Sequence, residues 1–276
     1  MLDFTSSGAR PREPIFFIPV SVLALVAILL AIHAALAWSS PEAQEALYLD
    51  WGFIPGRFTV SLWPDRLMRL LAASSADPHA LETARMWRDT TATHPGLRPW
   101  TLLTYAFLHG SWTHVGLNCV WIVAFGPPLA RRFGAVRFFL FFAATAVCGA
   151  LLHWLTSMMD FTPLIGASAA ASGFMAGAAR FVFQPGAPLG PALRAHARPP
   201  ERAASLAEVL TDRRALIFIV IWLATNIVFG AGARVLGAAE GPVAWIAHIG
   251  GFVGGLALFP LFDGDWRGFD GRARVG

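Results

Sequence analysis

The sequence contains no lysine, and only 14% of its 276 residues carry a charged side chain. Average soluble domains have about 25% charged residues, so a chain this poor in charge is not an ordinary soluble enzyme. Hydrophobic residues make up 56% of it, and the mean hydropathy is +0.56. An intrinsically disordered protein is excluded, because disorder requires low hydrophobicity. The surplus apolar side chains need a neighbour other than water, and a lipid bilayer is the simplest one.

Cysteine is also scarce, since Cys119 and Cys148 are the only two and both lie in apolar runs. They are expected to be small buried hydrophobes, not parts of a disulfide framework or a metal site. All 21 basic residues are arginines, and against 17 acidic residues they give a formal net charge of +4. These arginines are scattered in the breaks between apolar runs and form no clustered basic strip of the nucleic-acid-binding kind. We therefore expect no nucleic-acid partner, no metal and no cofactor.

Long apolar runs predict an all-α membrane protein. The first run, Ile15–Trp38, has 24 residues, more than the roughly 7–15 of a secretory signal core, so it predicts a retained spanning helix. Since about 20 residues cross the hydrocarbon core, five further runs bring the expected number of transmembrane helices to six. These runs are Trp112–Ala130, Val136–Met158, Ser168–Phe183, Ala215–Gly232 and Val243–Phe262.

The expected organisation is a cytoplasmic segment at 1–14, a six-span domain at 15–262 and a cytoplasmic tail at 263–276. Within the domain, 39–111 forms a long first loop and 184–214 a cytoplasmic linker. The linker and the break after the second run are rich in arginine, so the positive-inside rule puts both termini in the cytoplasm. The lysine-free, arginine-rich composition suggests a bacterial genome rich in G and C, so the expected location is the bacterial inner membrane.

The run that starts at Ser168 is short for a span, at 16 residues. An apolar, loop-like stretch at 163–167 precedes it. Irregular backbone at membrane depth is tolerated only where protein covers it or where it lines a wet cavity. We therefore expect this helix to begin below the membrane surface, inside a bundle.

A polar side chain within a span is a functional hypothesis by default. His114 and Asn118 stand four residues apart, so they share one face of the second predicted span. Ser168 and Ser172 are likewise four apart at the start of the fourth span, and His248 lies in the sixth.

Other polar residues receive plainer interpretations. Asn226, in the fifth span, is expected to make an interhelical hydrogen bond. His33, near the end of the first span, is expected at the membrane interface. His109 shortly precedes the second span, and His153 is assigned no role.

Ser168 follows Gly166 at a predicted helix start, where free backbone N–H groups can stabilise an oxyanion. A free hydroxyl is a weak nucleophile, and His248 could supply the general base that activates it. His114 and Asn118 could then donate hydrogen bonds to the developing oxyanion.

Glycine pairs supply a way to bring these groups together. Gly173 and Gly177 form one Gly-x-x-x-Gly face, and Gly251 and Gly255 form another. Such faces let two helices approach closely, which a hydrogen bond between serine and histidine on different helices requires.

This combination resembles the rhomboid family of intramembrane serine proteases, from about Trp100 to the end of the sixth predicted span. The family patterns H-x-x-x-N, G-x-S-G and A-H-x-x-G-x-x-x-G correspond to His114-Val-Gly-Leu-Asn118, Gly166-Ala-Ser168-Ala169 and Ala247-His248-Ile-Gly-Gly251-Phe-Val-Gly-Gly255.

The resemblance implies a six-helix bundle with a water-filled cavity and a Ser168–His248 dyad that has no acidic third member. It also implies an oxyanion hole formed by His114, Asn118 and the backbone N–H of Ser168. Gly166, Ser172, Gly251 and Gly255 would support the site. The implied substrates are single-span membrane proteins, cut in or near the spanning segment.

The chain departs from the family at three positions. Ala169 replaces the second glycine of G-x-S-G, and Thr101 follows Trp100 where the family often has arginine. Ser172 stands where some bacterial members carry an aromatic residue, and we expect its hydroxyl to orient His248 or Ser168.

Two other functions use the same residues. An inactive rhomboid-like protein would bind membrane clients without cutting them, although both Ser168 and His248 are present. A transporter would use the polar residues as a relay, but no inverted repeat of the kind found in transporters is visible. The substrate and the oligomeric state stay open.

Overall fold

A computed structural model of the chain describes residues 18–65, 69, 82, 96–184, 202–235 and 244–264, apart from the side chains of 229–235. The segment predicted at 1–14 and nearly all of the tail predicted at 263–276 lie outside these residues. The described part is helical and holds no strand, only an isolated bridge between Phe53 and Leu164. The predicted all-α class is therefore confirmed.

The helices follow the predicted apolar runs, with ends that differ by a few residues. The first, fourth, fifth and sixth runs correspond to α1 (Val20–Ala37), α8 (Ser168–Val182), α10 (Arg213–Val235) and α11 (Trp245–Asp263).

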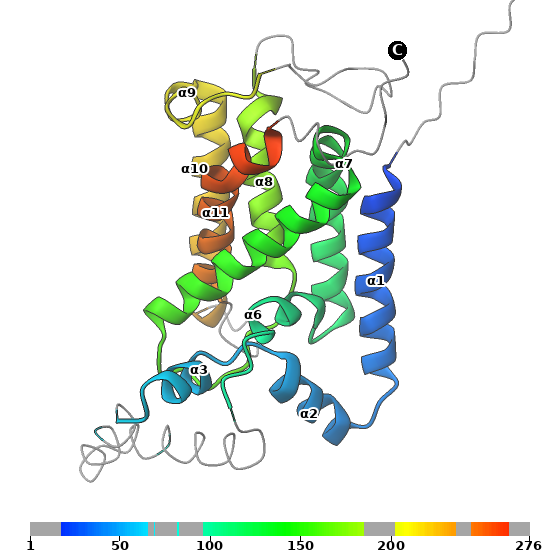
Figure 1. Ribbon diagram of the computed structural model, residues 1–276, viewed down its shortest axis with the longest axis vertical. Helices are drawn as coiled ribbons and strands as arrows, with labels where there is room; N and C mark the ends of the chain where they lie inside the picture. The colour runs from blue at the N-terminus through cyan, green and yellow to red at the C-terminus, as the bar shows by residue number, and fades with distance from the viewer. Residues whose placement is uncertain are drawn as a thin grey trace, which may run out of the picture.

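The second and third runs form one continuous element, α7 (Trp112–Thr156), which bends at Gly134. Gly134 has φ 76° and ψ 169°, a conformation that only glycine adopts without strain. The break predicted between these two runs is thus a glycine kink within 45 residues of helix. Figure 1 shows the two arms of α7 running in different directions across the molecule.

The segment predicted as a long first loop is partly helical and folds against one end of the bundle (Figure 1). It contains α2 (Pro41–Trp51), α3 (Pro55–Leu62), α6 (Thr101–Thr104) and the 3₁₀ turn η1 (Tyr105–Phe107). Most of α3 is buried, and its Thr59 hydroxyl accepts a hydrogen bond from Trp154 at 2.8 Å. The guanidinium of Arg57 donates to the carbonyl of Gly52 at 3.2 Å, and burial lowers the pKa of this arginine to about 10.

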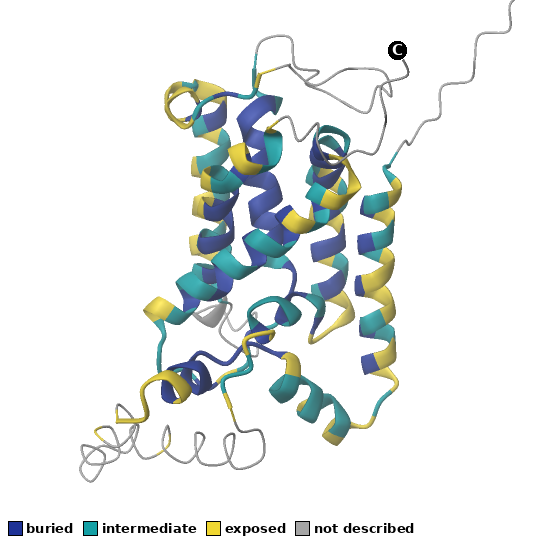
Figure 2. Ribbon diagram, in the orientation of Figure 1, coloured by how far each residue is buried: buried dark blue, intermediate teal, exposed yellow. Residues whose placement is uncertain are grey.

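Helix α8 lies at the centre of the bundle, against both α7 and α11. Its side chains from Ala169 to Phe181 are all buried, whereas α1 and α10 keep many exposed side chains (Figure 2). A helix buried on every side needs an apolar or small surface all round. The Ala- and Gly-rich sequence of α8 supplies one.

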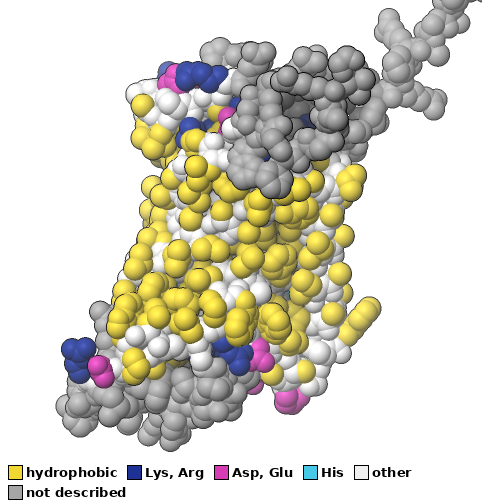
Figure 3. Space-filling model, in the orientation of Figure 1, with side chains coloured by type: hydrophobic (Ala, Val, Ile, Leu, Met, Phe, Trp, Pro, Cys, Tyr) yellow, Lys and Arg dark blue, Asp and Glu magenta, His cyan; other side chains and the backbone are white. Residues whose placement is uncertain are grey.

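The molecule has the surface of a membrane protein. The helices α1, α7 and α11 are long and apolar enough to cross a bilayer. Figure 3 shows hydrophobic side chains over the flank of the bundle and charged ones near its ends. At 15 residues, α8 is about 22 Å long by the helix rise, shorter than a typical span. The count of six membrane crossings stays a prediction.

Candidate active site

Ser168 is the first residue of α8, and the backbone before it is shaped by a glycine. Gly166 has φ +116°, which disfavours any side chain. A Cβ at this position would lie 2.7 Å from Nε2 of His114 and 3.7 Å from Nδ2 of Asn118. The shared face predicted for these two residues of α7 therefore points at the backbone just before Ser168.

Hydrogen bonds hold this backbone in place. The N–H of Gly166 donates to the carbonyl of Tyr105 at 2.9 Å, and the N–H of Ala167 donates to Nε2 of His109 at 3.3 Å. The Tyr105 hydroxyl in turn donates to the carbonyl of Ala146, in the second arm of α7, at 2.7 Å. The segment that presents Ser168 is thus tied to η1, to the segment before α7 and to α7 itself.

His109 has a larger role than its sequence suggested. It is fully buried, and its carbonyl accepts hydrogen bonds from the Tyr48 hydroxyl at 3.0 Å and from Nδ1 of His33 at 3.1 Å. His109 therefore connects α1 and α2 to the backbone before Ser168. Its position outside the H-x-x-x-N spacing gave no signal of this.

His33 is buried within the protein, and its predicted depth at the membrane interface stays a prediction. Its side chain is only 4% exposed and meets the Trp112 ring edge-on, with 4.6 Å between ring centroids. The carbonyl of His109 satisfies Nδ1 of this histidine inside the protein, so the ring does not need water at that atom.

Asn118 carries an unusual buried group. The residue is 3% exposed, and its Nδ2 has no hydrogen-bond partner within the described part of the chain. Buried amide donors are nearly always satisfied, so an unsatisfied one calls for an explanation. The N-terminus of α8 is also left without a side-chain cap, and the first N–H groups of a helix have no acceptor within it. Donors from α7 and α8 therefore lie beside the backbone that leads into Ser168.

Ser168 and His248 are both partly buried, on α8 and α11. No hydrogen bond joins the Ser168 hydroxyl to the His248 ring in the part of the chain that the structure describes. The ring of His248 instead places Nδ1 2.7 Å from Oδ1 of Asn226 on α10. The interhelical hydrogen bond predicted for Asn226 is confirmed, and its partner is the proposed base. No spacing rule in the sequence joins two residues that lie 22 positions apart in this way.

Ser172 contacts Ser168, one of the two partners predicted for it, but at the backbone carbonyl and not at the hydroxyl. Its hydroxyl donates to the carbonyl of Ser168, one turn earlier in α8, at 2.9 Å. This bond is the usual one for serine within a helix. Among the described residues, no hydrogen bond of Ser172 reaches the Ser168 hydroxyl or His248.

The glycines of α11 allow the close packing predicted for them. A Cβ on Gly251 would lie 1.9 Å from the carbonyl oxygen of Ala169, and one on Gly255 would lie 2.4 Å from that of Gly173. Gly177 differs from the prediction, since a Cβ there would meet Phe141 of α7 at 3.0 Å. The two faces are therefore not a matched pair: Gly251 and Gly255 of α11 pack on the backbone of α8, whereas a Cβ on Gly173 or on Gly177 would meet α7.

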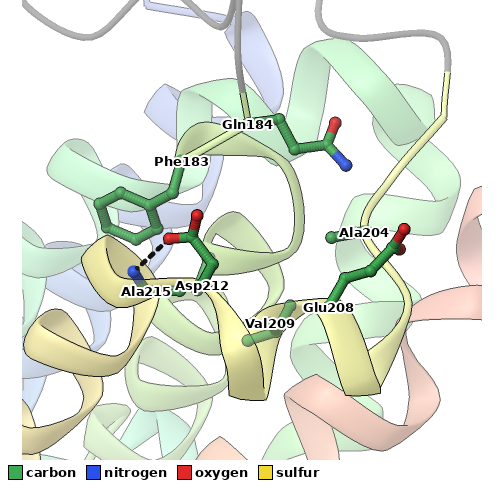
Figure 4. A pocket seen from close by; sticks show the side chains of 8 residues that line it. Phe183, Gln184, Ala204, Glu208, Val209, Asp212 and Ala215 are labelled. Atoms are coloured by element: carbon green, nitrogen blue, oxygen red, sulfur yellow. Dashed lines mark hydrogen bonds between the residues drawn. The ribbon is translucent and has the colours of Figure 1, made fainter.

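A pocket of about 200 Å³ lies at the opposite end of α8, beside Phe183 and Gln184 (Figure 4). Its two acidic residues serve as helix caps. Asp212 accepts a hydrogen bond from the N–H of Ala215 at 2.8 Å, and Glu208 accepts one from the N–H of Ser205 at 2.6 Å. This pocket is separate from the site at Ser168.

Comparison with known protein families matches the part of the chain that contains Ser168 and His248. Residues 97–262 match the model of the rhomboid domain. The chain is 35% identical over 92 residues to YdcA of Bacillus subtilis (strain 168), which is named as a rhomboid protease. That match covers 32% of this chain and 46% of YdcA.

Rhomboid-related protein 3 of Homo sapiens is 38% identical over 87 residues, or 30% of this chain and 21% of the human protein. The mouse protein of the same name is 34% identical over the same length, again 21% of that protein. The chain thus spans less than half the length of each of these relatives. The family model covers more than half of the chain, and on that basis the chain belongs to the rhomboid family.

Proposed function

We propose that this protein is an intramembrane serine endopeptidase that hydrolyses peptide bonds of membrane-anchored proteins. The observation that carries the proposal is the buried Nδ2 of Asn118, which has no hydrogen-bond partner among the described residues and lies beside Gly166, two residues before Ser168. A hydrogen-bond donor held in this way has little purpose in the resting protein. It is useful when a negatively charged oxygen forms next to it, because preorganised donors stabilise such an oxygen in the transition state.

The proposed reaction uses Ser168 as nucleophile and His248 as base. His248 takes the hydroxyl proton while Oγ of Ser168 attacks the carbonyl carbon of the substrate. The carbonyl oxygen becomes an oxyanion, which accepts hydrogen bonds from Nε2 of His114, Nδ2 of Asn118 and the backbone N–H of Ser168. The proton then passes to the leaving amine, and an acyl-enzyme remains on Ser168. Water attacks that ester with His248 again as base, which releases the second product.

The position of Ser168 suits substrates that enter from the membrane. Helix α8 is shorter than a typical span and begins at Ser168 inside the bundle, so the reaction needs a local supply of water at that depth. The carbonyls of a substrate helix are already hydrogen-bonded, and the segment to be cut must unwind first. Single-span proteins with helix-destabilising residues near the cut are therefore the substrates we propose, and the bilayer is the medium.

The charge distribution supports an orientation. Arg132 pairs with Asp263, and Arg137 donates to the carbonyl of Gly264 at 2.8 Å. These groups lie where α11 ends, at the same end of the bundle as the start of α10, whose first residues are Arg213 and Arg214 (Figure 1). By the positive-inside rule we propose that this end faces the cytoplasm, and that the membrane is the inner membrane of a bacterium with both termini in the cytoplasm.

The test is cleavage of a tagged single-span substrate by the full chain in proteoliposomes. We expect Ser168→Ala to abolish cleavage. Ser61→Ala, the same change on the exposed side of α3, should leave it unchanged. Cleavage by Ser168→Ala within tenfold of wild type would remove the serine-protease assignment.

The second candidate is a rhomboid-like protein that binds membrane clients without cutting them. Two observations favour it: Ser168 and His248 share no hydrogen bond in the described structure, and Ala169 occupies the family's glycine position. A fluorophosphonate probe separates the two functions, because it reacts only with an activated serine. We expect labelling of the wild type and none of Ser168→Ala; an unlabelled wild type that still captures the substrate would favour the binder.

A further inference from the structure

Asn226 joins α10 to the proposed base through its side-chain amide. Oδ1 of Asn226 lies 2.7 Å from Nδ1 of His248, and Nδ2 of Asn226 donates to the carbonyl of Trp222 at 2.9 Å. Both polar atoms of the amide are thus engaged. Asn226 is itself partly buried, so these partners stand in for much of the water that the amide would otherwise bind.

The second hydrogen bond settles which way the amide faces. A carbonyl oxygen can only accept, so the group directed at the Trp222 carbonyl must be the NH₂ of Asn226. The oxygen of the amide therefore faces the ring of His248, and it too can only accept. Nδ1 of His248 must then carry the proton, and in the neutral ring Nε2 keeps its lone pair.

We infer that Asn226 is the positioning residue of His248, holding the ring in the tautomer whose Nε2 can accept the proton of Ser168. The inference rests on the proposed function of His248 as a base. The hydrogen bond to Nδ1 also restricts rotation of the ring. Asn226 thus does for this histidine what an acidic third member does in a catalytic triad, which orients the imidazole and selects its tautomer.

An amide suits this place better than a carboxylate. The site lies within a bundle surrounded by lipid, where burial of an ion costs far more than burial of a neutral group that keeps its hydrogen bonds. Asn226 supplies the acceptor without that cost.

The hydrogen bond between Asn226 and the His248 ring is not needed to hold α10 against α11. Helix α10 also packs on α11 through apolar surfaces, since the rings of Trp222 and Phe252 stack with 4.1 Å between centroids. Loss of the Asn226 amide therefore leaves that stacking intact, so activity and helix packing can be measured separately.

The experiment compares Asn226→Leu, which removes the acceptor at similar volume, with Asn226→Asp, which keeps one. Thr225→Ala is the control, because the hydroxyl of this exposed neighbour on α10 donates to the carbonyl of Ile221, at 2.7 Å, and to no other group in the described part of the chain. Loss of an orienting partner typically costs about 10–100-fold where a metal-bound histidine is concerned. We expect Asn226→Leu to lower kcat in proteoliposomes by about that factor with KM little changed. Asn226→Asp should recover part of the lost kcat, because its carboxylate also accepts a hydrogen bond from Nδ1–H.

A second readout follows the tautomer directly. In ¹⁵N-histidine-labelled protein, long-range proton–nitrogen correlations distinguish a ring protonated at Nδ1 from one protonated at Nε2, and His248→Gln assigns the signal. We expect the Nδ1-protonated form in the wild type and a mixture in Asn226→Leu, with the thermal unfolding midpoints of the two proteins compared alongside.

Each outcome bears on one proposal. If Ser168→Ala is inactive but Asn226→Leu cleaves like the wild type, the inference on Asn226 is overturned while the proposed function stands. If Asn226→Leu and Asn226→Asp lose activity equally, or lose it only in step with stability, a structural role replaces the positioning one. If Ser168→Ala still cleaves, the proposed function fails. In that case the inference on Asn226 is judged by the spectra alone, and it is overturned if the His248 ring stays protonated at Nδ1 in Asn226→Leu.

Discussion

Replacing Gly251 by alanine adds one methyl group where α11 meets α8. That methyl would lie 1.9 Å from the carbonyl oxygen of Ala169 and 2.6 Å from its carbonyl carbon. Both are backbone atoms, so no side chain can rotate away. A real Cβ does not come nearer than 3.0 Å to such atoms. The helices must therefore separate locally by the difference, about 1.1 Å or more.

This separation falls at the proposed site. Ala169 directly follows Ser168, and His248 lies one helical turn before Gly251. A displacement of about 1 Å between reacting groups can cost about 10²-fold in rate. We therefore expect Gly251→Ala to lower kcat by about that factor in the proteoliposome assay. Overpacking should also lower the thermal unfolding midpoint.

Gly116→Ala is the matched control. Gly116 lies within α7, and a Cβ there would meet nothing within 4 Å. The same chemical change should leave cleavage unchanged and stabilise the helix slightly, because alanine favours helices by about 1 kcal/mol over glycine. Wild-type cleavage by Gly251→Ala, with Gly116→Ala behaving as expected, would refute the argument that close contact between α8 and α11 aligns the site.

Three further predictions concern the proposed oxyanion donor Asn118, the ion pair between Arg132 and Asp263, and the pH dependence of stability that Glu208 contributes. Asn118→Ala should reduce kcat by about 10²–10³-fold without loss of folded protein. Arg132→Met leaves Asp263, which is 20% exposed, without its guanidinium partner; the loss of stability should fall below the about 3–5 kcal/mol typical of a fully buried pair, and adding Asp263→Asn should recover part of it. Hydrogen bonds from the backbone N–H and hydroxyl of Ser205 lower the pKa of Glu208 from 4.5 to about 2. The stability that this carboxylate contributes should be present above pH 4.5 and lost as the pH falls towards 2, so Glu208→Gln should show a smaller loss over that window.

The same assays can contradict these three predictions. Full activity of Asn118→Ala would remove the explanation for the buried Nδ2 of Asn118, which has no partner among the described residues. An unfolding midpoint of Arg132→Met equal to that of wild type would mean that the ion pair contributes nothing. Equal acid sensitivity of the wild type and Glu208→Gln, measured by thermal unfolding in detergent at pH 5 and pH 3, would assign the acid response to other carboxylates.

Local patterns predicted the helices well but could not foresee how they join. The apolar runs from Trp112 and Val136 were separated by a polar break, and the structure turns that break into a kink at Gly134. Whether the chain forms a loop or a helix kink at such a glycine depends on the side chains that pack against the two flanking helical segments. Likewise, α3 reads as part of a polar loop, yet it is buried because Phe161 and Trp154 lie against it.

At the candidate site, too, the sequence predicted the residues but not their hydrogen-bond partners. Motifs could name His114, Asn118, Ser168 and His248, because their chemistry is unusual in apolar helices. They could not show that Ser172 would bond to backbone, since every serine within a helix has a nearby carbonyl to compete for its hydroxyl.

The sequence by itself determined that this is a membrane protein, because a chain with so few charges and such long apolar runs is stable in a lipid bilayer and not in water. It also singled out the few polar residues that we propose carry the chemistry. Only the tertiary structure decided their partners: His109 accepts a hydrogen bond from the N–H of Ala167, and Asn226 binds His248. The physical reason is that a hydrogen bond depends on position and direction in space, and residues that lie 58 or 22 positions apart acquire these only when the helices pack.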